Sequence, residues 1–145
     1  MGFSFHGTPD WLRELLKNNC WDFVQIQLNY YDWYQGTAKQ QYEILRENGI
    51  PIMVMEPVHG GMLANLPEEC LQLLEKQSGS PATWALRFVM NLPGVTVVLS
   101  GMSDMRQTEE NVNTAACIGC GNCTAHCPQA LDIPCYMREM ANLLK

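Results

Sequence analysis

Short apolar segments alternate with segments of helical character over the first 114 residues, and this alternation constrains the fold more than any other feature of the sequence. The four strand-like segments are residues 3–6, 23–28, 51–55 and 95–99. The last two are almost continuously apolar, as expected for strands of a parallel sheet that is covered on its outer face. Strands that alternate with helices pair in parallel, with right-handed crossovers that place the helices against the sheet. The sequence therefore predicts an α/β fold with about four βα units.

Residues that favour helix starts precede three of the predicted helices. Thr8 is expected to cap a helix that follows it, Ser80 to begin a second, and Ser103 to cap a polar helix that continues to residue 113. Two further helices are expected at residues 37–47 and around residues 71–74. A glycine-rich loop at residues 56–61 follows the third strand and interrupts this regular alternation.

The composition indicates a globular protein with a substantial core. Of the 145 residues, 47% are hydrophobic and 17% are charged, which is too apolar for a disordered chain. The formal net charge of −6 repels phosphate backbones and anionic lipid surfaces, so nucleic acid and membrane surfaces are not expected as partners. No apolar run approaches the roughly 18 residues needed to cross a bilayer, and the first residues lack the features of a signal peptide. We therefore expect a cytoplasmic protein.

Four of the seven cysteines lie close together near the end of the chain and form the pattern C-x-x-C-x-x-C-x-x-x-C-P. This is the pattern of bacterial ferredoxins, in which cysteine thiolates hold a [4Fe–4S] cluster. Two-residue spacers let successive thiolates reach different irons, and glycines at positions 119 and 121 permit the tight turns between them. The predicted cluster ligands are Cys117, Cys120, Cys123 and Cys127.

The fourth ligand and the metal both have an alternative. In two-cluster ferredoxins the cysteine before proline serves the other cluster, so Cys135 is the second choice for the fourth ligand after Cys127. Structural zinc is the rival metal, because four thiolates also form a tetrahedral zinc site. Zinc sites usually separate two pairs of ligands by a longer spacer, which favours the cluster. Cys20 and Cys70 are expected to be ordinary buried thiols.

Four segments, read in order, resemble the second half of an aldo-keto reductase barrel. Residues 2–6 resemble its fifth strand, 24–30 its sixth, 51–63 its seventh strand with the following loop, and 98–111 its eighth strand and helix. The cysteine-rich tail is similar to the ferredoxin-like extension of one bacterial and archaeal branch of the family. The resemblance implies that residues 1–114 form the C-terminal half of a TIM (β/α)8 barrel. Residues 115–145 would form an iron–sulfur segment that ends in an amphipathic helix.

The resemblance also implies that the chain binds NAD(P)H across the carboxyl ends of its strands. Ser4 and Gln25 would hold the nicotinamide carboxamide, and the loop that contains Glu56 would pass close to the pyrophosphate. The cofactor-binding residues carried over by position are Ser4, Gln25, Pro57, Gly60, Gly61, Ser100, Gly101, Met102, Ser103, Glu110 and Asn111. Ser100 to Ser103 would meet the adenosine phosphate region, and Glu110 and Asn111 the adenine.

Three positions depart from the family pattern. Phe5 stands where an asparagine is expected, and Met55 stands where an aromatic residue would stack on the nicotinamide. The basic residue that would favour a 2′-phosphate falls on Gln107, although Arg106 is adjacent. The preference between NAD and NADP therefore stays open.

The family's catalytic Asp, Tyr, Lys and His come from the first four strands of the barrel, so no catalytic residue is assigned in this chain. A complete barrel takes roughly 250 residues, and we expect this chain to be a fragment of a longer reductase or a half-barrel that pairs with a second copy or with a complementary chain. The implied function is NAD(P)H-dependent reduction of a small carbonyl substrate, with a cluster that is structural or passes electrons to a redox partner. The alternatives are a non-enzymatic ferredoxin-like electron-transfer or docking module on a half-barrel scaffold, and a zinc-stabilised interaction domain.

Overall fold

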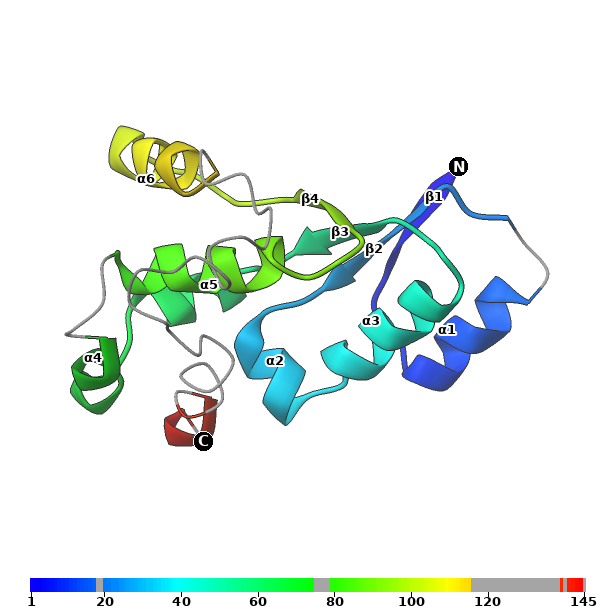
Figure 1. Cartoon of the computed structure of the whole chain (residues 1–145), viewed down its shortest axis with the longest axis horizontal. Helices are drawn as coiled ribbons and strands as arrows, with labels where there is room; N and C mark the ends of the chain where they lie inside the picture. Colours follow the sequence, from blue (N-terminus) through cyan, green and yellow to red (C-terminus); the bar gives the residue numbers. More distant parts are fainter. Residues whose placement is uncertain (18–19, 75–78, 116–138, 140, 145) are drawn as a thin grey trace.

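A computed structural model describes residues 1–17, 20–74, 79–115, 139 and 141–144 (Figure 1). Its centre is a four-stranded sheet in which the strands follow one another in chain order and all pair in parallel. The strands are β1 (Gly2–Phe5), β2 (Phe23–Gln27), β3 (Ile52–Met55) and β4 (Val95–Val98). The α/β fold and the parallel sheet predicted from the sequence are confirmed.

The described part of the chain has six α-helices and one 3₁₀ helix, of which all but the last lie between two of these strands and the last follows β4. They are α1 (Pro9–Leu16), α2 (Tyr30–Gln35), α3 (Ala38–Glu47), η1 (His59–Ala64), α4 (Glu68–Leu74), α5 (Pro81–Met90) and α6 (Met105–Ala115). Figure 1 shows α1 and α3 next to each other on the same side of the sheet. The short helix α2 was not predicted, because its six residues are too few to show a helical period in the sequence.

The two faces of the sheet differ in burial because successive side chains of a strand point to opposite sides. The face that the helices cover carries the aligned side chains of Phe5, Ile26 and Val54, which are all buried. The opposite face remains partly open in this chain. Phe23 is 36% exposed and Val97 is 40% exposed there. The edge strands β1 and β4 each pair on one side only within the described residues.

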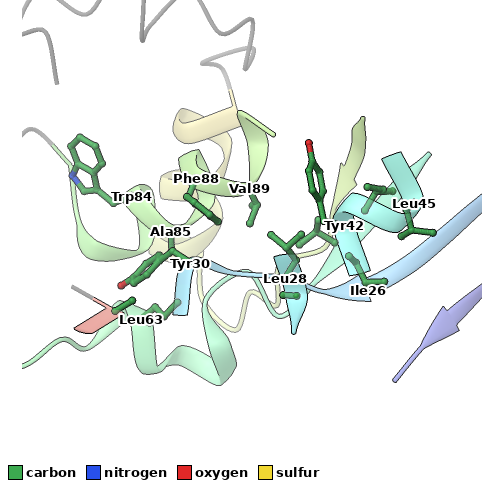
Figure 2. Close-up of a cluster of buried hydrophobic side chains, with 14 of the residues drawn as sticks. Ile26, Leu28, Tyr30, Tyr42, Leu45, Leu63, Trp84, Ala85, Phe88 and Val89 are labelled. Carbon is green, nitrogen blue, oxygen red and sulfur yellow. The ribbon is translucent and has the colours of Figure 1, made fainter. Parts of the chain in front are cut away.

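The apolar core lies between the covered face of the sheet and the helices. Figure 2 shows Tyr30 beside Leu63 and Ala85 at one end of this cluster and Ile26 near Leu45 at the other. All five side chains have essentially no exposed surface. Their burial is the main favourable contribution to folding, at roughly 25 cal/mol per Å² of apolar surface removed from water.

Polar residues were predicted to begin three helices, and two of these predictions are confirmed. Thr8 Oγ1 accepts a hydrogen bond from the backbone N–H of Trp11 at 3.4 Å, and Ser80 Oγ accepts one from that of Thr83 at 3.1 Å. The third prediction is wrong by one residue. Asp104, not Ser103, caps α6, because its carboxylate accepts the Gln107 N–H at 2.8 Å. The backbone N–H of Ser103 instead donates to the Gln107 side chain.

Two further expectations concern the cysteines and the end of the chain. Cys70 is buried as expected, but Cys20 is exposed, so that prediction is wrong for Cys20. Residues 139 and 141–143 are helical, and Ala141 is fully buried where its carbonyl accepts from Gln35 Nε2 at 3.1 Å. The remainder of the predicted C-terminal amphipathic helix lies outside the described residues. None of the helices within the described ranges has the length and apolar character needed to span a bilayer.

Candidate functional site

A cleft of about 710 Å³ opens where β3 and β4 end. Since the strands are parallel, their carboxyl ends meet at one edge of the sheet, and the loops that follow them lie side by side. Ligands of barrel and open α/β folds bind at this edge. The cleft is formed by the β3–η1 loop, η1 itself, the β4–α6 loop, one side of α6 and the start of α5.

Most of the residues predicted to bind a dinucleotide are brought together in this cleft. The members that line it are Pro57, Gly60, Gly61, Ser100, Gly101, Ser103, Glu110 and Asn111. Met102 does not line it and is 50% exposed. These positions are up to 54 residues apart in the sequence, so their convergence follows from the parallel pairing of β3 with β4.

Ser4 and Gln25 lie beside the cleft, on the open face of the sheet. They are partners in the register between β1 and β2. Gln25 Nε2 lies 3.4 Å from Ser4 Oγ and 3.3 Å from the sulfur of Met55, and Met55 lines the cleft. Ser4 Oγ also contacts His6 Nε2 at 3.0 Å. The two polar groups predicted to hold a nicotinamide amide are therefore adjacent to each other and to one end of the cleft.

The loop after β3 has an unusual backbone. Gly60 and Gly61 have φ angles of 61° and 92°, and two non-glycine residues, Glu56 and His59, also have positive φ angles of 54° and 49°. Left-handed conformations of non-glycine residues are unfavourable and persist where surrounding contacts hold them. The methyl group of an alanine at Gly61 would meet no atom within 4 Å. The glycines thus leave open space for a ligand to approach the backbone closely.

A buried asparagine holds this loop against the end of β2. Asn29 has no exposed surface, and its Nδ2 donates to the Glu56 carbonyl at 3.0 Å and to Asp32 Oδ2 at 2.7 Å. Its Oδ1 caps α2 by accepting the Asp32 N–H at 2.8 Å. His59 Nδ1 lies 3.2 Å from Asp32 Oδ2, and Gln27 Nε2 donates to the same oxygen at 2.8 Å. The loop is therefore fixed from two directions.

Analysis of the sequence missed this network. The Asn29-x-x-Asp32 spacing is a local cap pattern that marks the start of α2. The contacts with Glu56 and His59 join residues 27 to 30 positions apart, and no local pattern indicates them.

The far end of the cleft is organised around Glu110. Its Oε1 accepts hydrogen bonds from Ser80 Oγ and from Thr83 Oγ1, the latter at 3.2 Å, and its Oε2 lies 3.6 Å from Arg106 Nη1. Asn111 Nδ2 donates to Ser100 Oγ at 3.0 Å, which joins α6 to the β4–α6 loop. Glu110 is thus held by the start of α5. Its hydrogen-bonding capacity is partly used within the protein.

The predicted cluster ligands Cys117, Cys120, Cys123 and Cys127, and the alternative Cys135, lie outside the described residues. Over the described ranges, no group of three or more His, Cys, Asp or Glu side chains is arranged to hold a metal ion. The assignment of these cysteines therefore stays a prediction from their spacing, which fits a cluster by ligand type and number.

The parallel half-barrel and the cleft at its strand ends define an α/β protein of the TIM-barrel type. The model of the aldo/keto reductase family matches residues 1–117, and a 4Fe-4S binding domain model matches residues 110–130. The chain belongs to the aldo/keto reductase family, which confirms the resemblance found in the sequence. The predicted boundary between residues 114 and 115 falls where the two matches overlap and stays a prediction.

Solved structures support the fold. The aldo-keto reductase AKR11C1 from Bacillus halodurans, in its holo form, superposes with a TM-score of 0.65 and 20% identity over 99% of this chain and 49% of that chain. Its apo form gives a TM-score of 0.64 and 19% identity over 97% of this chain and 49% of that chain. The chain thus spans about half the length of these structures, and its fold is part of a reductase barrel. A sequence comparison with curated proteins finds no match.

Proposed function

We propose that this chain is the dinucleotide-binding half of an NAD(P)H-dependent carbonyl reductase that also carries a [4Fe–4S] cluster. The observation that supports the first part is the convergence of eight of the eleven predicted cofactor-binding residues on one cleft. Membership of the aldo/keto reductase family supports the choice of ligand. Bound NAD(P)H supplies a hydride for reduction of a small carbonyl compound.

The residues of this chain would bind and orient the cofactor. The side-chain amide of Gln25 and the hydroxyl of Ser4 would hold the nicotinamide carboxamide beside Met55. Backbone N–H groups near Gly60 and Gly61 would face the pyrophosphate, since the glycines have no side chain of their own and the one side-chain atom found near them is the Glu56 carboxylate oxygen. Arg106 is the one cationic side chain among the described residues that line the cleft, and it lies 3.6 Å from the Glu110 carboxylate.

The open face of the sheet would be covered by four further βα units. Phe23 and Val97 are more than one-third exposed there, and β1 and β4 each have an unpaired edge within the described residues. Exposed strand edges and apolar patches are normally paired or covered. The covering units would come from the same polypeptide or from a second copy of this chain, and they would carry the catalytic groups. Size-exclusion chromatography that shows a stable monomer of this chain with cooperative unfolding would contradict this part of the proposal.

The cluster would be held by Cys117, Cys120, Cys123 and Cys127, within the region that the 4Fe-4S binding domain model matches. Hydride transfer needs no cluster, so the cluster would be structural or would pass electrons to a partner protein. A cytoplasmic location fits this assignment, because reducing conditions keep cysteine thiols free to bind the cluster. Iron and acid-labile sulfide in anaerobically purified protein would support the cluster, and zinc without iron would contradict it.

Direct binding measurements test the dinucleotide site. Gly101 lies on the cleft, its added Cβ would meet no atom within 4 Å, and its φ is outside the left-handed region, so a large side chain fits the backbone there. We expect the protein to bind NADPH or NADH in a fluorescence titration, and Gly101→Trp to weaken binding at least tenfold by filling the cleft. Gln40→Trp, on the exposed surface of α3, is the matched control and should bind as the unmodified protein does. Absence of binding to both dinucleotides would refute the proposal.

A second candidate function is supported by the match to the 4Fe-4S binding domain. The chain would then be a ferredoxin-like electron-transfer or docking module on a half-barrel scaffold. Measuring both cluster content and dinucleotide binding distinguishes the two functions. Protein that contains the cluster but binds neither NADPH nor NADH would favour the module over the reductase.

A further inference from the structure

The carboxylate of Glu56 lies at the point in the cleft where a ligand phosphate is expected. Glu56 lines the cleft, and its Oε2 accepts a hydrogen bond from the backbone N–H of Gly60. We propose that Glu56 is a specificity-determining residue of this cleft, whose carboxylate a ligand phosphate must displace from the Gly60 N–H. This inference rests on the proposed dinucleotide-binding function and adds a residue that selects ligands by their phosphate charge.

The backbone of Glu56 is fixed, whereas its side chain is free to move. The Glu56 carbonyl accepts hydrogen bonds from Asn29 Nδ2 and from the His59 N–H, both at 3.0 Å. Asn29 is fully buried, and His59 is held in turn by Asp32. The Glu56 side chain is exposed, and the Gly60 N–H is the partner found for its carboxylate. The carboxylate can therefore leave Gly60 without a rearrangement of the loop.

A phosphate oxygen and a carboxylate oxygen compete for the same donor. Successive backbone N–H groups in left-handed or turn conformations form a concavity that attracts anions, and Gly60 and Gly61 both have positive φ angles here. Gly60 donates to Glu56, while the Gly61 N–H donates to the Val58 carbonyl at 3.0 Å. The Gly60 N–H is therefore the donor that a ligand gains when Glu56 moves away.

No cationic side chain that lines the cleft in the described residues offsets the repulsion between the Glu56 carboxylate and a ligand phosphate. Among the described residues that line the cleft, Glu56 and Glu110 are acidic and Arg106 is basic. Arg106 lies 3.6 Å from Glu110, so its charge is balanced there. A ligand phosphate at the Gly60 N–H thus meets a net negative surface. The cleft should accept the neutral adenosine part of a nucleotide more readily than its phosphates.

Glu56→Gln separates the effect of charge from that of shape. Glutamine keeps an oxygen that can accept the Gly60 N–H, so the loop is retained while the negative charge is removed. Glu47→Gln is the matched control, because Glu47 is an exposed carboxylate at the end of α3 that does not line the cleft. The probes are adenosine, AMP and ADP, titrated at low ionic strength against the full chain with its cluster intact.

We expect Glu56→Gln to bind ADP about fivefold more tightly than the unmodified protein, as for the removal of one charge roughly 4 Å away in a solvent-rich cleft. Adenosine affinity should be unchanged, AMP should be intermediate, and the gain for ADP should shrink at high salt. Glu47→Gln should bind all three probes as the unmodified protein does. A purely structural role of Glu56 would instead weaken binding of adenosine and ADP alike.

Unchanged or weakened ADP binding by Glu56→Gln would overturn the inference. A second measurement on the unmodified protein keeps the test decisive if the variant does not fold. In a ¹H–¹⁵N NMR titration with ADP, the Gly60 amide should shift strongly and should not respond to adenosine, and a Gly60 amide that does not shift with ADP would also overturn the inference. If NADPH binds but Glu56→Gln brings no gain, this inference fails and the proposed function stands. If no adenine nucleotide binds to either protein, both fail.

Discussion

Replacing Asn29 with alanine is expected to lower the free energy of unfolding by about 3 kcal/mol. The side chain is fully buried, caps α2, and donates to both Asp32 and the Glu56 carbonyl. Loss of an N-cap costs about 1 kcal/mol. Loss of a hydrogen bond to a charged carboxylate costs about 1.5 kcal/mol or more, and a neutral one about 1 kcal/mol. The expected loss of free energy of unfolding is set slightly below the sum of these three contributions, because two partners keep other hydrogen bonds. Gln27 still donates to Asp32, and the His59 N–H still donates to Glu56.

Urea unfolding followed by tryptophan fluorescence measures this loss, and Asn29→Ser is the control. Serine retains a cap acceptor but has no amide group to reach Glu56, so it should recover about 1 kcal/mol relative to alanine. NADPH affinity should fall in both variants, because the loop at residues 56–61 loses its anchor on β2. An alanine variant within about 1 kcal/mol of the unmodified protein would show that the network does not hold the loop. Equal stability of the serine and alanine variants would show that the cap contributes nothing.

Three further predictions concern the cluster, the core and the glycine loop. Cys127→Ser is expected to lose iron and acid-labile sulfide while Cys135→Ser retains both, and the reverse result would assign the fourth ligand to Cys135. Burial, with a smaller effect of nearby Cys70, raises the pKa of the Tyr30 hydroxyl above its usual value of 10.0. The unfolded chain then loses this proton first, so stability should be retained below about pH 10 and fall above it. Tyr30→Phe should reduce that fall in urea unfolding at about pH 11, and an unchanged pH dependence would contradict the argument. Gly61→Ala should cost about 1–2 kcal/mol in urea unfolding because φ is 92°, whereas Gly101→Ala should cost less than about 0.5 kcal/mol; equal losses would refute the backbone explanation.

Local patterns account for what could be predicted from the sequence. The strands predicted at residues 51–55 and 95–99 correspond to β3 (Ile52–Met55) and β4 (Val95–Val98). They could be predicted because a continuous apolar run is typical of a strand in a parallel sheet. The helix starts at Thr8 and Ser80 were found because a cap joins residues only three positions apart. The same local reasoning missed by one residue at Asp104, where two adjacent polar residues both suit the cap position.

The resemblance to the reductase family located most of the cleft, but not the contacts within it. It placed Glu110 toward the adenine, whereas the structure shows the carboxylate also bound to Ser80 and Thr83 at the start of α5. It placed Ser4 and Gln25 at a nicotinamide, and the structure shows both in contact with Met55, which lies 51 and 30 residues away. Such contacts depend on the register of the three strands.

The sequence alone determined the alternation of strands and helices, the ferredoxin-like cysteine spacing and the glycines of the loop after β3. Each of these features depends only on residues that are close to one another along the chain. Only the tertiary structure decided that Asn29 and Asp32 hold Glu56 and His59. The physical reason is that parallel pairing brings the ends of β2 and β3 together across an intervening helical crossover. Side chains about 30 residues apart then meet at distances that no local pattern specifies.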